Sequence, residues 1–149
     1  MRILVLNGPN LNMLGLREKE IYGSVSLKSI EDILKKIAKD NDCEINFYQS
    51  NAEHHLIDAI HNSYDKKIDY IIFNPAAFTH TSIALRDALL AVQIPFYEIH
   101  ISDIKTREEF RQISYFSDIA KKVYIGQGID GYVNALKNAL DIEEQIDGY

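Results

Sequence analysis

Short apolar runs alternate with helical patterns along the whole chain, and this alternation constrains the fold more than any other feature. Runs rich in branched side chains predict strands buried in a sheet. Apolar residues at helical spacing, such as Leu27, Ile30 and Leu34, predict amphipathic helices between those runs. We expect strands at 2–6, 44–49, 70–73, 94–99 and 122–125, and helices from about residue 26, around 56–64, at 81–91 and at 129–142, with a short helix at 106–112.

Repeated strand-helix alternation indicates an α/β fold. The crossover from one parallel strand to the next is right-handed, so the helices cover both faces of the sheet. With five strands, the expected arrangement is a flavodoxin-like parallel sheet. A chain of 149 residues is of the size of one domain, so residues 1–149 are expected to form a single domain.

Composition and charge exclude several classes of function. The net charge is −6 and the basic residues are scattered, which argues against nucleic-acid binding. No apolar run is long enough to span a membrane, and Met1 leads directly into a predicted strand without a signal peptide. The single cysteine, Cys43, cannot form an internal disulfide, and a reducing cytoplasm suits it.

Polar residues follow the predicted strands where each strand ends. In a parallel sheet these ends lie along one edge, which is where open α/β proteins bind ligands. The edge is rich in amides and hydroxyls and poor in charge, which suits a small polyhydroxylated, anionic molecule. Its residues are Asn7, Gly8, Pro9, Asn10, Gln49, Ser50, Asn51, Asn74, Pro75, His100, Ile101 and Ser102.

The loop after the first strand carries Arg17 and Tyr22. A tyrosine acts as a base only as phenolate, and a free phenol titrates near pH 10. Lowering that pKa to about 7 takes roughly 4 kcal/mol of preference for the phenolate, much of which a neighbouring guanidinium could supply. Spacing alone favours an ordinary exposed tyrosine and arginine over a catalytic pair.

Two histidines lie at the same predicted edge. His80 is close to the start of the helix at 81–91, and His100 follows the strand at 94–99. Each could be a general acid or a hydrogen-bonding anchor, and each could equally be a buried imidazole with satisfied hydrogen bonds. Glu98 projects on the same side of its strand as His100 and could orient the ring.

Other constellations point away from cofactor and metal chemistry. The stretch 126–131 matches a dinucleotide-binding glycine pattern, but no further strand follows to supply the acidic ribose ligand, so a turn and helix start is expected. The histidines lack metal-binding spacing, so no metal site is expected. No lysine is predicted in a desolvated position suited to a Schiff base.

Several stretches taken together resemble the type II 3-dehydroquinate dehydratases, the type II dehydroquinases. They run through the chain in that family's order, and the chain length fits one family domain. They are Leu6-Asn7-Gly8-Pro9-Asn10-Leu11-Asn12, Gly15, Arg17, Tyr22, Gly23, Gln49-Ser50-Asn51, Asn74-Pro75, Thr79-His80-Thr81-Ser82, Leu85-Arg86-Asp87-Ala88, Glu98-Ile99-His100-Ile101-Ser102, Arg107 and Arg111.

The resemblance implies dehydration of 3-dehydroquinate to 3-dehydroshikimate, an anti elimination through an enolate in the shikimate pathway. Tyr22 would take the proton beside the ketone, and Arg17 would hold Tyr22 as phenolate. Asn10 would position a water on the enolate oxygen. His100 would protonate the departing hydroxyl, with Glu98 orienting it.

The resemblance also implies a binding site and an assembly. Asn74, His80, Ile101, Ser102 and Arg111 would hold the substrate carboxylate and ring hydroxyls. No cofactor is implied, and a lid at about 16–24 would close over the substrate. The family forms trimers grouped into a dodecamer, so we expect a homo-oligomer in which Asp87 reaches a neighbouring subunit's site.

Three stretches depart from the family pattern. Ala52, Glu53 and His54 stand where the pattern has His and then Glu-Gly, Ala76 stands where Gly is frequent, and Asp103 stands where Asn is usual. These departures concern backbone geometry and subunit contacts.

Two other classes of function compete with the enzyme. A flavodoxin-like module that binds a nucleotide or flavin phosphate would need a Ser/Thr/Gly-rich loop after the first strand, whereas Pro9 removes an N–H donor there. A signalling receiver domain would need acidic residues at the same place, and this chain has asparagines.

Overall fold

The computed structural model of the protein describes residues 1–16 and 25–144. These residues form a five-stranded, wholly parallel sheet in the order β2-β1-β3-β4-β5. The strands are β1 (Arg2–Asn7), β2 (Glu44–Gln49), β3 (Tyr70–Asn74), β4 (Phe96–His100) and β5 (Lys122–Ile125). The predicted α/β class and flavodoxin-like strand order are confirmed.

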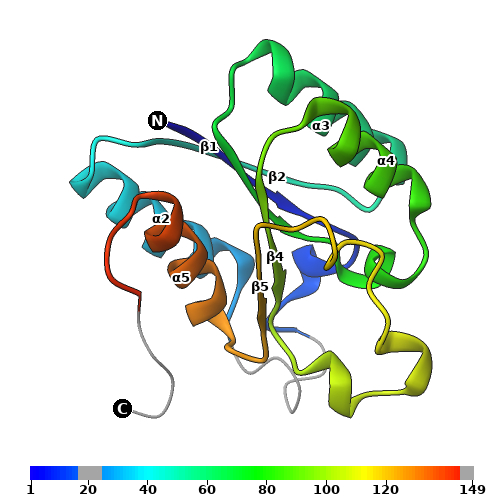
Figure 1. Ribbon diagram of the computed structural model, residues 1–149. Coiled ribbons are helices and arrows are strands. Elements are labelled where there is room, and N and C mark those ends of the chain that lie inside the picture. The colour runs from blue at the N-terminus through cyan, green and yellow to red at the C-terminus, as the bar shows by residue number, and fades with distance from the viewer. Residues whose placement is uncertain (17–24, 145–149) are drawn as a thin grey trace.

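Helices cover both faces of the sheet (Figure 1). On one face α2 (Leu27–Asp40) lies beside α5 (Ile129–Ala139), and on the other α3 (Glu53–Asp65) lies beside α4 (Ile83–Val92). Short 3₁₀ helices occupy the connections: η1 (Leu11–Met13), η2 (Ala76–His80), η3 (Ile104–Thr106) and η4 (Glu109–Arg111). The sheet is therefore the middle layer, as the continuous apolar strands require.

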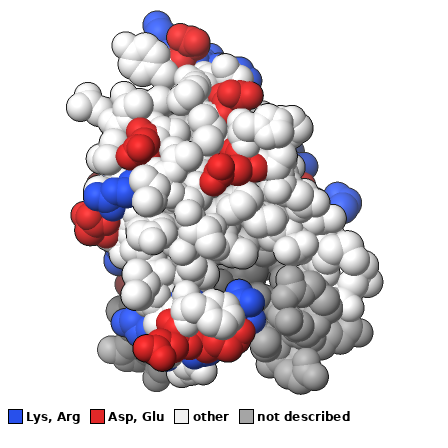
Figure 2. Space-filling model, turned by 90° about the vertical axis from the view of Figure 1, so that its right-hand side faces the viewer, with Lys and Arg blue, Asp and Glu red and all other residues white. Residues whose placement is uncertain are grey.

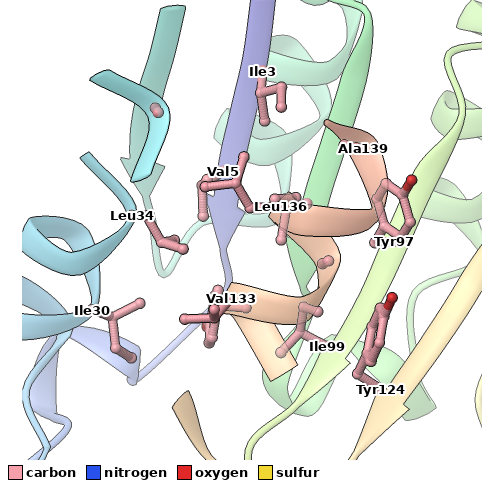
Figure 3. Packing of buried hydrophobic residues seen from close by; sticks show 14 of the residues in the cluster. Ile3, Val5, Ile30, Leu34, Tyr97, Ile99, Tyr124, Val133, Leu136 and Ala139 are labelled. Carbon is pink, nitrogen blue, oxygen red and sulfur yellow. The ribbon is translucent and has the colours of Figure 1, made fainter. Parts of the chain in front are cut away.

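Alternate residues of β1 enter the two halves of the core. Ile3 and Val5 pack with Leu34 of α2 and Leu136 of α5 (Figure 3). Leu6, which points the other way, packs against the helices on the opposite face. All of these side chains are fully buried, and burying a leucine or isoleucine contributes about 1.5–3 kcal/mol.

The first helix begins where the sequence predicts. The Ser26 side chain accepts a hydrogen bond from the Ser29 backbone N–H at 3.1 Å, and the Ser29 side chain accepts one from the Ser26 N–H at 3.1 Å. This reciprocal cap satisfies two backbone donors that a helix start leaves unpaired, and such a cap contributes about 1 kcal/mol.

Three helix predictions need correction. The helix predicted at 129–142 ends at Ala139, and Asp141 just beyond it has a left-handed backbone (φ 57°). The single short helix predicted at 106–112 is wrong, because Arg107 has an extended backbone (φ −92°, ψ −168°) that separates η3 from η4. The helix predicted from residue 81 begins at Ile83, because the Ser82 side chain caps it by accepting the Leu85 N–H at 3.0 Å.

Candidate active site

A pocket opens at the carboxyl ends of β1, β3 and β4, the edge at which the sequence predicts a ligand site. It is lined by Pro9, Asn10, Leu11, Leu14, Asn74, Ala76, Ala77, His80, His100, Ile101, Ser102, Ile104, Arg107 and Arg111. Among these described residues the only charged side chains are the two arginines. The lining therefore suits an anionic ligand that also carries hydroxyl groups.

Hydrogen bonds between strand ends fix the loop after β1. The Gly8 N–H donates to the Asn74 carbonyl at 2.8 Å, and the Gln49 side chain donates to the Gly8 carbonyl at 3.2 Å. The Asn10 N–H donates to the Asn51 side chain at 2.9 Å. Asn10 itself has a left-handed backbone (φ 68°), which asparagine tolerates better than most residues. These bonds place Asn10 at the pocket wall.

Gly8→Ala is expected to destabilise the protein by roughly 2–3 kcal/mol or more. A Cβ at residue 8 would lie 2.3 Å from the Pro75 carbonyl oxygen, so the backbones of two loops would have to separate. Gly131→Ala is the matched control, because a Cβ on this residue of α5 would lie 3.5 Å from Ile99 and Tyr124 of the sheet, which is an ordinary van der Waals contact. Chemical denaturation checks both variants, and equal losses of unfolding free energy would contradict the account.

His100 and Glu98 form a buried pair at the end of β4. His100 is 5% exposed and Glu98 is 0% exposed. The His100 Nε2 atom is hydrogen-bonded to the Glu98 carboxylate, so Glu98 orients the ring, as the alternation of side chains along the strand predicts. With Nε2 engaged, Nδ1 is the ring nitrogen left to exchange a proton with a ligand.

Two serines complete the surroundings of Glu98. The Ser114 hydroxyl donates to Oε2 at 2.7 Å, and the Ser117 hydroxyl donates to Oε1 at 2.8 Å. Burial alone would raise the pKa of Glu98, but the hydrogen bonds from His100 and the serines outweigh it and hold the pKa below its usual value. Glu98 is therefore a carboxylate at neutral pH and accepts the hydrogen bond from the His100 ring.

His80 presents an acceptor to the pocket. Its Nδ1 lies 2.7 Å from the Ile113 carbonyl oxygen, which can only accept, so Nδ1 carries a proton. Burial lowers the pKa of His80, the hydrogen bond to Ile113 partly opposes that shift, and the nearby His100, Arg111 and Arg107 lower the pKa further. At neutral pH the ring is therefore uncharged, and Nε2 can accept a hydrogen bond from a ligand hydroxyl.

The lowered pKa of His80 predicts a loss of stability in mild acid. The unfolded chain takes up this proton near pH 6.5, whereas the folded protein takes it up only at lower pH. This contribution is complete above about pH 6.5 and is lost as the pH falls. The thermal midpoint should fall between about pH 7.5 and 5, and His80→Asn, which keeps a donor for Ile113, should flatten that dependence. An unchanged slope in the variant would refute this role.

Arg107 and Arg111 border the pocket from the segment that follows β4. The Arg111 Nε donates to the Glu108 carboxylate at 3.1 Å, and the Arg107 Nε lies 3.9 Å from the same carboxylate. Hydrogen bonding to Arg111 lowers the pKa of Glu108, which keeps this partner ionised. One carboxylate outside the pocket thus holds Arg111 at the pocket wall.

Most predicted site residues come together here, and two of the described ones, Glu98 and Asp87, do not line the pocket. Asn10, Asn74, His80, His100, Ile101, Ser102 and Arg111 line it. Glu98 lies behind His100. Asp87 is exposed on α4, away from the lining. Arg17 and Tyr22 lie outside the described residues.

Several residues that contribute to the site were not predicted from the sequence. Ser114 and Ser117 carried no recognisable signal, because their role depends on a loop that returns to Glu98. Tyr132 was also missed, although its hydroxyl contacts Asn7 and Asn74 at the strand ends. Arg107 belongs to the family pattern but had been given no role at the site.

The glycine-rich stretch after β5 is a turn and helix start, as predicted. The Gly126 N–H donates to the His100 carbonyl at 3.0 Å, and the Gly128 N–H donates to the Ile101 carbonyl at 3.1 Å. Both glycines have positive φ values, 72° and 60°. The turn therefore supports the chain immediately after His100.

Charge and metal-ligand patterns do not suggest another kind of site. On the face in Figure 2 the basic side chains lie in scattered groups among acidic ones, and the surface is hollowed beside the grey residues. Within residues 1–16 and 25–144, no group of three His, Cys, Asp or Glu side chains could hold a metal ion. In the same ranges no helix is long and apolar enough to cross a membrane.

Comparisons with known proteins identify the family of this chain. The family model for dehydroquinase class II matches residues 1–140. The 3-dehydroquinate dehydratase of Mannheimia succiniciproducens is 57% identical over 140 residues, covering 94% of this chain and 93% of that protein. Its counterpart from Pasteurella multocida is 58% identical over 139 residues, covering 93% of each chain.

A solved structure extends the similarity to three dimensions. The type II dehydroquinase from Butyrivibrio crossotus aligns with a TM-score of 0.91 at 44% identity, covering 93% of this chain and 97% of that one. The family model, the relatives and this structure all match across nearly the whole chain. The protein therefore belongs to the class II dehydroquinase family.

Proposed function

We propose that this protein is a type II 3-dehydroquinate dehydratase, which converts 3-dehydroquinate to 3-dehydroshikimate in the shikimate pathway. The observation that carries the proposal is the His100–Glu98 pair at a pocket whose charged lining, among the described residues, consists of two arginines. Family membership and the names of the relatives supply the substrate.

The reaction is an anti elimination of water through an enolate. A C–H bond beside the ketone breaks first, and Tyr22 takes that proton as phenolate. Arg17 holds Tyr22 in that form by its positive charge. Asn10 positions a water that donates to the enolate oxygen, and its place in the pocket wall supports this role. Tyr22 and Arg17 are assigned from the family pattern alone.

His100 completes the elimination by protonating the departing hydroxyl. Nδ1 is the ring atom that delivers the proton, because Nε2 is already bonded to Glu98. The carbon–oxygen bond then breaks, water leaves and the enone forms. No electrons are gained or lost overall, so the elimination balances without a redox cofactor.

Arg111 and the Ile101–Ser102 segment hold the substrate carboxylate, and Asn74 and His80 hold ring hydroxyls. The charge of Arg111 and the acceptor on His80 support this division of roles. Arginine suits a carboxylate because its guanidinium can donate two parallel hydrogen bonds. Because His80 is neutral, its Nε2 can accept a hydrogen bond from a hydroxyl, and the ring carries no charge that would compete with Arg111 for the carboxylate.

We also infer a homo-oligomer, a dodecamer built from trimers, in which Asp87 approaches a neighbouring subunit's pocket. Ile83 and Leu90 of α4 are 56% and 47% exposed and flank Asp87 on the same helix. Exposed apolar side chains beside a charge suit a subunit interface. Light scattering should give the mass of twelve chains, and a monomer would contradict the assembly.

The buried lone thiol of Cys43 suits the cytoplasm, where we place the enzyme.

Turnover of 3-dehydroquinate tests the proposal. The product is a conjugated enone, so its ultraviolet absorbance reports the reaction directly. Purified wild-type protein should generate that absorbance without added metal or cofactor. Absence of turnover from folded protein, or a flavin spectrum in the purified protein, would favour the binding-module alternative instead.

A further inference from the structure

We propose that Tyr132 is a positioning residue for this active site, because its hydroxyl sets the orientation of the Asn74 carboxamide. The inference rests on the proposed function, in which Asn74 binds a ring hydroxyl. Tyr132 lies on α5 and is fully buried. Its hydroxyl lies 2.9 Å from Asn74 Nδ2 and 2.7 Å from Asn7 Oδ1.

The directions of these hydrogen bonds follow from a backbone donor. The Ala76 N–H donates to the Asn74 side chain at 3.1 Å, and only the amide oxygen can accept it. The Asn74 NH₂ group therefore faces Tyr132 and donates to the phenolic oxygen. The proton of Tyr132 is then directed to Asn7 Oδ1, which completes the chain of hydrogen bonds.

These hydrogen bonds leave one donor and one acceptor of the Asn74 side chain for a ligand. One of its two N–H groups serves Tyr132, and one lone pair of its oxygen serves Ala76. The remaining N–H and lone pair are held at fixed positions in a residue that lines the pocket. If the carboxamide could flip, its NH₂ group and its oxygen would change places. Asn74 would then no longer present a donor and an acceptor to the ligand at defined positions.

Because Tyr132 is buried, its hydrogen bonds to Asn7 and Asn74 do not change with pH. Burial raises the pKa of Tyr132 well above its usual value, so the phenol retains its proton. Asn7 and Asn74 are paired residues at the ends of neighbouring strands, and they are 1% and 3% exposed. The hydroxyl therefore joins the ends of β1 and β3 where water cannot substitute for it.

Tyr97 provides a matched control. It is fully buried in the same core cluster (Figure 3). Its hydroxyl donates to Asn138 Oδ1 at 2.7 Å. Asn138 lies in the last turn of α5 and does not line the pocket. Removing either hydroxyl deletes a hydrogen bond from a tyrosine in the core, but of these two bonds only that of Tyr132 reaches a residue that lines the pocket, Asn74.

The experiment compares Tyr132→Phe, Tyr97→Phe, Asn74→Ala and the double variant Tyr132→Phe/Asn74→Ala. Tyr132→Phe should raise KM for 3-dehydroquinate about tenfold and change kcat by less than about twofold. Tyr97→Phe should leave both constants within about twofold of wild type. The double variant should match Asn74→Ala, because Tyr132 acts through that side chain.

Three outcomes would overturn the proposal. Equal KM values for Tyr132→Phe and Tyr97→Phe, or a double variant whose loss is the product of the single losses, would overturn this inference alone. No turnover by wild type would overturn the proposed function as well. If Tyr132→Phe does not fold, Asn7→Ala replaces it: without its acceptor the Tyr132 proton can turn toward Asn74, so KM should again rise.

Discussion

His100→Gln is expected to lower kcat for the dehydration of 3-dehydroquinate by roughly 10²- to 10⁴-fold, with KM changed by only about threefold. The amide NH₂ group of glutamine can replace the ring Nε2 as a donor to Glu98. It leaves no acid at the position of Nδ1, so the departing hydroxyl must leave without protonation. Steady-state kinetics by enone absorbance measures both constants.

His61→Gln is the control for this change. His61 is exposed on α3 and does not line the pocket, so its replacement should leave kcat and KM unchanged. If His100→Gln retained wild-type kcat while folded, another group would have to be the acid. A loss confined to KM would instead make His100 a binding residue.

Glu98→Gln is expected to lower kcat by about 10³-fold. A carboxylate can accept from His100, Ser114 and Ser117 at once, whereas an amide has a single oxygen and its NH₂ group must face a donor. The imidazolium form of His100 loses its counter-charge. Leaving a buried donor unpaired should also cost about 1–3 kcal/mol of unfolding free energy.

Glu44→Gln makes the same chemical change at the surface. Its carboxylate pairs with Arg2 at 2.8 Å, and the two side chains are 57% and 53% exposed. Exposed ion pairs contribute little, so activity should be unchanged and stability should change by less than about 1 kcal/mol. If Glu98→Gln left kcat unchanged, as is expected for Glu44→Gln, the pairing of Glu98 with His100 would not contribute to catalysis.

The fold could be predicted largely from the periodicity of its apolar residues. Strands such as β1 are buried on both faces, so their branched apolar runs are unmistakable. The segment between β4 and β5 was less accessible to prediction. It is held by 3₁₀ turns and by contacts such as that of His80 with Ile113, and no sequence period encodes such contacts.

The site was predictable where residues sit at strand ends. Glu98 and His100 lie two residues apart in one strand, so their meeting follows from side-chain alternation. Tyr132 comes from the last helix, and Ser114 from a loop sixteen residues beyond Glu98. Partners so distant along the chain are brought together by tertiary packing and leave no local pattern.

The departures from the family pattern can be located in the structure. Ala76 keeps a left-handed backbone (φ 53°), which glycine would adopt without strain and which costs alanine about 1 kcal/mol. Asp103 caps η3 by accepting the Lys105 N–H at 3.0 Å. His54 is exposed on α3. None of the three replaces a residue assigned to catalysis.

The most direct test of the central claim is the turnover of 3-dehydroquinate by wild-type protein and Tyr22→Phe purified in parallel. We expect growth of enone absorbance with wild type and a rate at least about 10²-fold lower with the variant, because phenylalanine cannot accept the proton. The parallel preparation also controls for contaminating host enzyme. Equal rates from the two preparations would contradict the assigned base, and no turnover from folded wild type would contradict the activity itself.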